Sequence, residues 1–272
     1  MSPISVAVSG ALGKMGREVV KTVLADSELT LAGVVDLSCV GQDVATAIGL
    51  SESCGILVQE SLTAMLTEKK PQVCVDFTHP SSALSNTLAI VDADCRPVIG
   101  TTGLSDADME AIRQALNTKK LGGMVVPNFA IGAVLMMKFA KEASKYLDHA
   151  EIIELHHNQK ADAPSGTADN TAKGMVEALK ESGKSQFGST NKPEKEMISG
   201  ARGALVEGNL RIHSVRLPGF VAHQEVIFGS SGQILTLRHD SLDRACFMPG
   251  VALSAKKVVE LTGLVIGLED VL

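Results

Sequence analysis

The sequence predicts an α/β protein: an N-terminal Rossmann-type doubly wound parallel sheet, followed by a second α+β domain built on an open mixed or antiparallel sheet. Three observations predict this class. Short apolar runs alternate with helical patterns in the first half of the chain, and strand-like alternation returns after a long helical pattern in the second half. The chain has 272 residues, 45% hydrophobic and 21% charged, which is enough apolar material for two soluble domains.

The first predicted unit of the sheet is a strand, a helix and a second strand. Residues 4–10 form an apolar run that ends in glycine, a helical pattern follows through Leu24, and a second run ends in Asp36. Three further apolar runs stop at small or polar residues: 72–78, 97–103 and 122–130. The carboxyl ends of such parallel strands are expected to line a ligand crevice.

The pattern changes after Asn128. Residues 131–147 have helical spacing, and a strand-like run with two histidines, a polar helix and a loop near 181–200 follow. Three segments then alternate as strands do: 211–219, 223–230 and 233–240. Residues from about Leu242 are helical in pattern and are expected to pack on the first domain. We therefore predict one domain from 1–127 plus about 241–272, and a second from 128–240.

Composition excludes several classes of protein. A formal net charge of −6 disfavours nucleic-acid binding, because such proteins carry a basic stripe that displaces counterions. No uncharged run reaches membrane-spanning length, and no basic leader precedes the first apolar run, so neither a membrane span nor a signal peptide is expected. Five cysteines without CxxC spacing indicate reduced thiols, not a zinc site or a disulfide framework, which favours the cytoplasm. Cys39, close to Asp36, is interpreted as incidental.

A glycine turn links the first strand to its helix. Its glycines are Gly10, Gly13 and Gly16, a GxxGxxG spacing where GxGxxG is commoner. Glycines at this position let the backbone approach a pyrophosphate, and the helix N-terminus supplies free N–H groups and a positive dipole. The turn therefore predicts a dinucleotide site.

Asp36 bears on which dinucleotide is used. It ends the second strand roughly 20 residues after the turn, where an acid can bind ribose hydroxyls. A carboxylate there repels a 2′-phosphate and Leu37 offers no guanidinium, so NADH is favoured over NADPH. Lys14 and Arg17 could still bind a phosphate, which leaves dual use open. The alternative for Asp36 is an ordinary acid that caps a loop.

The segment "ELHHNQKADAPSGTA" suggests a second site. His156, His157 and Lys160 precede a Pro-Ser-Gly-Thr turn that opens a helix. The N–H groups of that turn and the ammonium would bind carboxylates, and a histidine can donate a proton near neutral pH. The segment predicts a site for a small dianionic acid that is protonated. The alternatives are a metal site, which adjacent histidines on a strand disfavour, or a solvated surface turn.

These residues also carry a family resemblance. The fragments "VAVSGALGKMGR", "VDFTHPSS", "VIGTTG", "PNFAIG", "ELHHNQKADAPSGTA" and "LPGFVAHQEVIFG" occur in the order typical of dihydrodipicolinate reductase, also called 4-hydroxy-tetrahydrodipicolinate reductase. The resemblance covers nearly the whole chain. It implies NAD(P)H-dependent reduction of 4-hydroxy-tetrahydrodipicolinate to tetrahydrodipicolinate in the diaminopimelate route of lysine biosynthesis. It also implies a homotetramer in which sheets of the second, substrate-binding domain meet.

The resemblance implies roles for individual residues. His156 would be the proton donor, and Lys160 would assist it and pair with substrate. The substrate carboxylates would contact His157, Ser165, Gly166 and Thr167, with Thr102 reaching the substrate as well. The cofactor would contact Gly10, Ala11, Leu12, Gly13, Lys14, Met15, Asp36, Gly100, Thr101, Thr102, Val126, Pro127, Asn128 and Phe129. No metal is expected.

Two positions depart from the family pattern. His79 and Leu37 stand where some members have arginine, which bears on the choice between NADH and NADPH but not on the reaction.

Two other functions remain as alternatives. A two-domain dehydrogenase of a sugar or semialdehyde would share the glycine turn but would not need the Pro-Ser-Gly-Thr turn. A non-catalytic dinucleotide sensor would use only the turn and Asp36.

Overall fold

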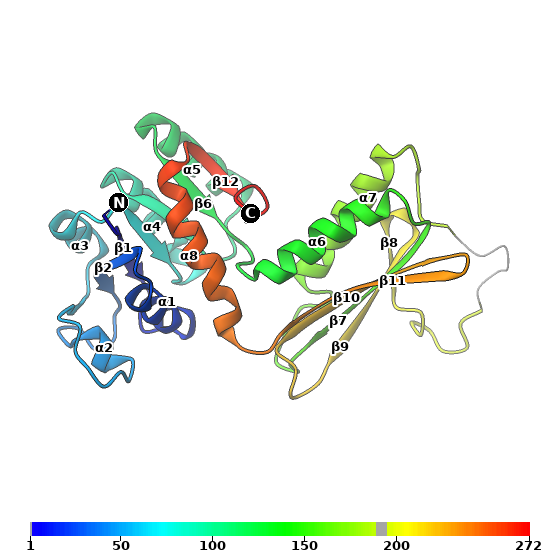
Figure 1. Cartoon of the computed structure of the whole chain (residues 1–272), viewed down its shortest axis with the longest axis horizontal. Helices are drawn as coiled ribbons and strands as arrows, with labels where there is room; N and C mark the ends of the chain where they lie inside the picture. The colour runs from blue at the N-terminus through cyan, green and yellow to red at the C-terminus, as the bar shows by residue number, and fades with distance from the viewer. Residues whose placement is uncertain (1, 189–194) are drawn as a thin grey trace. The chain divides into compact units, whose positions relative to one another are not determined.

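The protein forms two compact units. The structure is a computed structural model that describes residues 2–188 and 195–272. One unit comprises Met1–Phe129 together with Arg244–Leu272, and the other comprises Ala130–Asp243 (Figure 1). The first unit is therefore assembled from two separate stretches of the chain.

The first unit is built on a seven-stranded sheet in the order β12-β6-β5-β4-β1-β2-β3. Every neighbouring pair in it is parallel. Its strands are β1 (Ile4–Ser9), β2 (Leu29–Val35), β3 (Val58–Gln59), β4 (Val73–Asp76), β5 (Arg96–Ile99), β6 (Gly122–Val125) and β12 (Gly263–Ile266). The central strands are continuous apolar runs because helices cover both faces of a parallel sheet; Val6, Ala7 and Val8 are fully buried.

The helices of this unit form two groups. They are α1 (Lys14–Ala25), α2 (Val44–Ala47), α3 (Leu62–Lys69), α4 (Pro80–Asp92), α5 (Asp106–Lys119) and α8 (Met248–Lys257). Helices α3, α4 and α5 pack in succession, and α1 packs on α8. The strand order reverses between β1 and β4, so right-handed crossovers place the two groups on opposite faces. The predicted doubly wound sheet is confirmed, and a crevice is expected at the reversal, beyond the carboxyl ends of β1 and β4.

Two parts of this unit differ from the sequence-based prediction. The two-residue edge strand β3 was not predicted. Residues 263–266 were expected to be helical but form β12, which pairs with β6 in parallel. The run is only four residues long and lies between Gly263 and Gly267, both with positive φ, so it is too short for helical periodicity to be distinguished from a buried strand.

The second unit is built on a mixed five-stranded sheet in the order β11-β10-β7-β9-β8. Its strands are β7 (His149–His156), β8 (Ala204–Val206), β9 (Leu210–Arg216), β10 (Ala222–Ser230) and β11 (Gln233–Ser241). Strands β7 and β9 are parallel, and the other pairs are antiparallel. The two helices α6 (Ile131–Ser144) and α7 (Gly166–Glu181) pack on each other, α6 contacts β11 and α7 contacts β7.

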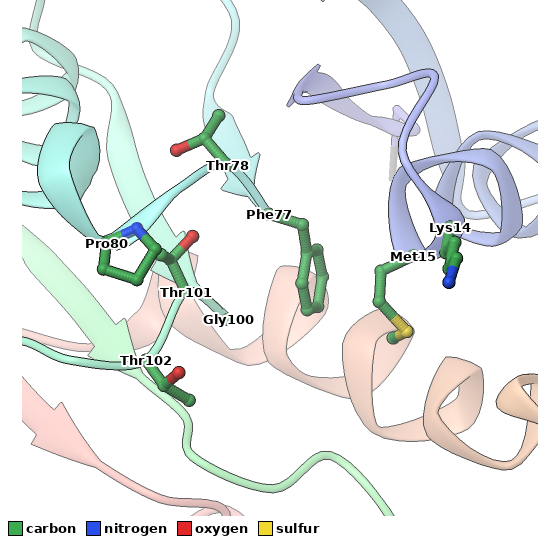
Figure 2. A pocket seen from close by; sticks show the side chains of 8 residues that line it. All are labelled: Lys14, Met15, Phe77, Thr78, Pro80, Gly100, Thr101 and Thr102. Atoms are coloured by element: carbon green, nitrogen blue, oxygen red, sulfur yellow. The ribbon is translucent and has the colours of Figure 1, made fainter. Parts of the chain in front are cut away.

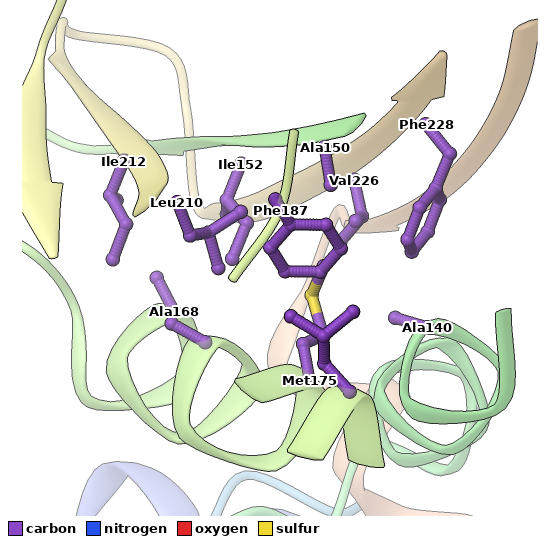
Figure 3. Packing of buried hydrophobic residues seen from close by; sticks show 12 residues of the cluster. Ala140, Ala150, Ile152, Ala168, Met175, Phe187, Leu210, Ile212, Val226 and Phe228 are labelled. Atoms are coloured by element: carbon purple, nitrogen blue, oxygen red, sulfur yellow. The ribbon is translucent and has the colours of Figure 1, made fainter. Parts of the chain in front are cut away.

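The core of the second unit lies between these helices and one face of the sheet (Figure 3). Ile152, Val226 and Ile212 are register partners on β7, β10 and β9, and they point into this core with Met175 of α7. The alternate residues of β7, such as Glu151 and Ile153, are only half-buried and lie on the other face. The predicted open mixed sheet is confirmed.

The loop predicted near 181–200 is partly seen. Residues 189–194 lie outside the described residues. Helix α7 ends at Glu181, and the described parts 182–188 and 195–200 have no helix or strand. Phe187 fixes the first part, because it is buried in the core and its N–H donates to the Gly208 carbonyl at 2.8 Å. Short 3-10 turns complete the chain: η1 (Glu207–Asn209), η2 (Arg244–Phe247) and η3 (Val258–Glu260). Among the described residues, no helix has the length and apolar character that a membrane crossing requires.

Candidate active site

The glycine turn brings α1 directly against the end of β1. Gly10 has φ +77°, and a Cβ there would lie 2.6 Å from the Phe77 carbonyl oxygen. A Cβ on Gly16 would lie 2.0 Å from the Gly10 carbonyl oxygen, inside any permitted contact. Only glycine therefore fits at both positions, which places the first turn of α1 close to the crevice.

The N-terminus of α1 has no side-chain cap. Its N-cap is Gly13, which has no side chain to offer an acceptor. Within the described part of the chain, the N–H groups of Lys14, Met15 and Gly16 have no recorded acceptor, whereas the Arg17 N–H donates to the Gly13 carbonyl at 3.0 Å. Free N–H groups and the helix dipole are the donor set that a pyrophosphate needs, so the turn fits a dinucleotide.

Asp36 lies just beyond the end of β2 and contacts the glycine turn. Its Oδ2 accepts from the Leu12 N–H at 2.8 Å, and its Oδ1 accepts from the Ser38 N–H at 2.9 Å. A carboxylate oxygen has a second lone pair, so both oxygens can still accept from ribose hydroxyls. Leu37 beside it is 83% exposed and offers no positive charge.

A pocket of about 340 Å³ lies beyond the ends of β1, β4 and β5 (Figure 2). Five predicted residues line it: Lys14, Met15, Gly100, Thr101 and Thr102. Phe77, Thr78 and Pro80 also line it, and they are not among the residues predicted from the sequence. Their signal was their place directly after a strand adjacent to the switch point, where ligand contacts concentrate in this architecture.

Asp76 holds two walls of this pocket together. It is fully buried at the end of β4. Its Oδ1 accepts from the Thr78 hydroxyl and from the Thr101 hydroxyl, both at 2.8 Å, and its Oδ2 accepts from Asn86 Nδ2 at 3.0 Å. Because a buried carboxylate must be hydrogen-bonded, these contacts fix the loops after β4 and β5 relative to each other.

The predicted residues Val126, Pro127, Asn128 and Phe129 follow β6 in the same unit. The Val126 N–H donates to the Ile99 carbonyl at 2.9 Å, which continues the sheet beyond β6. The ring of Phe129 lies 5.5 Å from the ring of Phe77, measured between centroids. The segment therefore contacts the pocket indirectly, because the ring of Phe129 packs near that of Phe77, which lines the pocket.

His156 ends β7 in the second unit, and a buried carboxylate holds its ring. Its Nδ1 lies 2.5 Å from Glu154 Oε2. Arg216 binds the same carboxylate with two parallel hydrogen bonds, Nη1 to Oε2 at 2.9 Å and Nη2 to Oε1 at 2.7 Å. Burial alone would raise the pKa of Glu154, but hydrogen bonds from His156, Arg216 and Ser214 lower that pKa to about 2. Glu154 is therefore an anion at every physiological pH.

The loop after β7 carries the other two predicted groups. His157 is exposed, and its Nδ1 accepts from the Gln159 N–H at 3.2 Å. Lys160 is 23% exposed in its side chain, and its Nζ donates to both carboxylate oxygens of Asp162 at 2.8 and 2.9 Å. The hydrogen bond from Lys160 is the main cause that lowers the pKa of Asp162. An incoming carboxylate would compete with Asp162 for this ammonium.

The predicted Ser-Gly-Thr turn begins α7. Ser165 is buried and caps the helix, because its Oγ accepts from the Ala168 N–H at 3.2 Å. Gly166 is exposed, and a Cβ there would meet no atom within 4 Å, so packing does not require glycine at this position. A bare backbone at a helix N-terminus leaves room for an anion to approach, and Thr167 follows it in the first turn.

The structure thus groups the predicted residues by unit. His156, His157, Lys160, Ser165, Gly166 and Thr167 all lie in the second unit, between the end of β7 and the start of α7. Thr102 lies with the cofactor residues in the first unit. Glu154 and Arg216 are not among the site residues predicted from the sequence. Among the described residues, no group of His, Cys, Asp and Glu could hold a metal ion.

Comparisons with known proteins agree along the whole chain. Family models described as the N-terminus and the C-terminus of dihydrodipicolinate reductase match residues 4–129 and 132–272. The chain is 51% identical to the 4-hydroxy-tetrahydrodipicolinate reductase of Nostoc sp., covering 100% of this chain and 99% of that protein. It is 50% identical to the reductase of the same name from Picosynechococcus sp., again over 100% and 99%.

A solved structure gives the same result. The dipicolinate-bound dihydrodipicolinate reductase of Paenisporosarcina sp. superposes with a TM-score of 0.87 at 44% identity, covering 99% of this chain and 100% of that one. The family predicted from the sequence is confirmed. This chain belongs to the dihydrodipicolinate reductase family.

Proposed function

We propose that this chain reduces 4-hydroxy-tetrahydrodipicolinate to tetrahydrodipicolinate with NADH or NADPH as the hydride donor. Relatives of that name are about half identical to it over their full length, which supports the activity. The observation that carries the proposal is the geometry of residues 156–167. A histidine anchored by a buried carboxylate, an ammonium and the N-terminus of α7 follow one another there. A small dicarboxylate that must accept a proton fits this combination, as does the dipicolinate bound by the Paenisporosarcina enzyme.

The residues have distinct tasks in this mechanism. The glycine turn and the N–H groups of α1 bind the pyrophosphate, Asp36 binds the ribose, and Thr101, Thr102 and the residues around Phe129 flank the nicotinamide. A bound nicotinamide supplies a hydride to an electron-poor ring carbon of the substrate. Lys160, His157 and the turn Ser165–Thr167 hold the two substrate carboxylates.

His156 completes the reduction. The ring system that has accepted the hydride is an enamine-like anion, and His156 gives it a proton through Nε2. The imidazole then takes a proton from solvent. The 4-hydroxyl group of the substrate leaves as water, and the dihydrodipicolinate ring formed in this way gains two electrons and two hydrogens, one as the hydride and one as the proton.

The direct test is a spectrophotometric assay of NADH and NADPH oxidation. Freshly prepared 4-hydroxy-tetrahydrodipicolinate is added to the purified full-length chain, and loss of reduced nicotinamide absorbance is followed. Oxidation that depends on both enzyme and substrate is expected. Binding of NADH without any substrate-dependent oxidation would instead support a dinucleotide sensor.

We further propose that NADH is preferred, and the variant Asp36→Ala tests this. Loss of the carboxylate removes an acceptor for ribose hydroxyls and a repulsion toward a 2′-phosphate. The Kd of NADH should rise about tenfold and that of NADPH less, because a hydrogen bond to a charged group contributes about 1.5 kcal/mol or more. Kd is measured by titration of the cofactor's own fluorescence. The companion variant Leu37→Arg should tighten NADPH alone. A larger loss for NADPH in Asp36→Ala would reverse the preference.

The role proposed for Lys160 is tested by Lys160→Met, which keeps the apolar stem and removes the charge. KM for the substrate should rise about tenfold and kcat should fall several-fold, because one charge-assisted hydrogen bond to a carboxylate is lost. The matched control is Lys180→Met at the other end of α7, where the ammonium forms an exposed ion pair with Glu207 at 2.5 Å. Equal kinetics for both variants would remove Lys160 from the site.

The quaternary structure proposed for the chain is a homotetramer assembled through the open sheet of the second unit. The half-buried face of β7, away from the α6 and α7 side, supports this because it includes apolar Ile153 and Leu155. Light scattering of the full chain gives the mass directly.

A further inference from the structure

Glu154 occupies a position that a carboxylate does not ordinarily take. It lies on the core face of β7 beside Ile152, in register with Gln224 of β10 and Ser214 of β9, and its side chain is 0% exposed. A charge removed from water is costly unless hydrogen bonds replace its hydration. The hydrogen bonds of Glu154 therefore indicate which function its burial serves.

Its two oxygens join three parts of the proposed site. Oε2 accepts from His156 Nδ1 and from Arg216 Nη1. Oε1 accepts from Arg216 Nη2 and, at 3.3 Å, from the Ser165 N–H at the start of α7. Arg216 Nη2 also donates to the Asp162 carbonyl at 2.7 Å, on the loop that carries Lys160. One buried ion pair thus holds the end of β7, the lysine loop and the helix start together.

We propose that Glu154 and Arg216 are positioning residues for His156. They keep one hydrogen on Nδ1 in both the charged and the neutral ring, so the proton that goes to the substrate is bound and released at Nε2. The proposal deepens the proposed function, because it rests on His156 as the proton donor. Within the described part of the chain, no hydrogen-bond partner is recorded for Nε2, so that nitrogen is available to the substrate.

The reason lies in what a carboxylate can do. An ionised carboxylate only accepts hydrogen bonds, so the ring nitrogen facing it must carry a hydrogen. The imidazolium therefore has Nδ1–H on Glu154 and Nε2–H for the substrate, and after it donates, the neutral ring keeps the same hydrogen bond. Arg216 fixes the plane of the carboxylate by its two parallel contacts.

Glu154→Gln should reverse this arrangement without changing the shape of the side chain. The amide oxygen would take the place of Oε1, where it accepts from Arg216 Nη2 and the Ser165 N–H, and the amide NH₂ would take the place of Oε2. There the NH₂ faces Nδ1 and donates to it, while the hydrogen bond from Arg216 Nη1 is lost. His156 would be held with its hydrogen on Nε2 and would be a poor site for a second proton, as when an asparagine replaces the aspartate behind a catalytic histidine.

A merely structural role for the ion pair is the rival explanation, and a kinetic cycle separates the two. We expect Glu154→Gln to lower kcat about 100-fold with KM within about threefold, since loss of a partner that orients a functional histidine typically has an effect of this size. In the His156→Asn background, the same substitution should change kcat less than about twofold, because its effect acts through the imidazole. A structural role would lower activity by the same factor in both backgrounds.

Nitrogen NMR of the imidazoles tests the inference without any turnover. The wild-type spectrum should show Nδ1 of His156 protonated and Nε2 bare in the neutral ring, with the assignment made by loss of the signals in His156→Asn. In Glu154→Gln the two nitrogens should exchange roles. Glu151→Gln is the matched control, because Glu151 lies on the same strand but contacts His213 Nε2 at 2.7 Å on the other face, so only the His213 signals should change.

The NMR spectra and the kinetic cycle each have an outcome that contradicts the proposal. A bare Nδ1 in wild-type His156, or equal kinetic losses in the two backgrounds, would overturn the positioning role. The wild-type spectrum decides even where Glu154→Gln does not fold. A chain that shows the expected tautomer but no substrate-dependent oxidation would refute the proposed function and leave the positioning of His156 intact.

Discussion

His156→Asn is expected to lower kcat about 1000-fold, in the middle of the range for loss of a general acid. The side-chain amide of asparagine can keep a hydrogen bond to Glu154, since its nitrogen lies near the place of Nδ1, so the buried carboxylate is not left unpaired. What is lost is the group that we propose carries the transferable proton. The Kd of NADH should stay within about twofold of wild type, because the cofactor residues lie in the other unit.

The measurement is a pair of steady-state kinetics and cofactor fluorescence titration, with His149→Asn as the control. His149 begins the same strand and is exposed, so the same substitution there should leave kcat unchanged. A kcat for His156→Asn within about tenfold of wild type would show that another group, or water, supplies the proton.

Gly16→Ala is the second large effect expected. Its Cβ would lie 2.0 Å from the Gly10 carbonyl oxygen and 2.8 Å from Ala11 Cα, both backbone atoms that cannot rotate away. The first turn of α1 must then move off the glycine turn. We expect the free energy of unfolding of the first unit to fall by about 3 kcal/mol, as for overpacking in a close-packed interior. The Kd of NADH should rise about 100-fold, because the N–H groups no longer converge on the pyrophosphate.

Far-ultraviolet circular dichroism in urea gives the stability, and NADH fluorescence gives the affinity. Gly174→Ala is the control, because it is also a helical glycine but its Cβ would meet no atom nearer than Lys141 Cδ at 3.9 Å. That variant should gain about 0.5–1 kcal/mol from the better helix propensity of alanine. A stable Gly16→Ala chain with unchanged NADH binding would contradict the role of the turn.

The sequence was sufficient for the strands whose apolar runs are clearly separate from the helical patterns around them. Strands β1, β2, β4, β5 and β6 follow from apolar runs that end at small or polar residues, and the pocket lies beyond the ends of three of them, β1, β4 and β5. The two edge strands could not be predicted in the same way. Strand β3 has only two residues. Strand β12 has four, like β4, β5 and β6, but it follows helical residues 248–260 so closely that its apolar run resembles a continuation of that helical pattern. Each of the two strands adds to an existing edge that offers backbone partners.

The residues of the candidate site also fall into those that could be predicted from the sequence and those that could not. The turn from Gly10 to Gly16 and the segment from His156 to Thr167 are continuous in sequence, so their local chemistry can be recognised. The contact between Glu154 and Arg216 joins residues 62 positions apart, through the parallel pairing of β7 and β9. One signal was present in the sequence: strand alternation places Glu154 on the same face as apolar Ile152, and a charge on a core face requires a partner.

The order in which the chain is synthesised determines when the first unit can complete its fold. Its sheet takes its final edge strand, β12, from residues that follow the whole second unit, and α8, which packs on α1, also comes after that unit. A nascent chain can therefore finish the second unit before the first unit, whose sheet keeps one edge bare until residues 263–266 have been made. Truncation near the C-terminus would damage the N-terminal fold, although the two are separated by more than a hundred residues of the sequence.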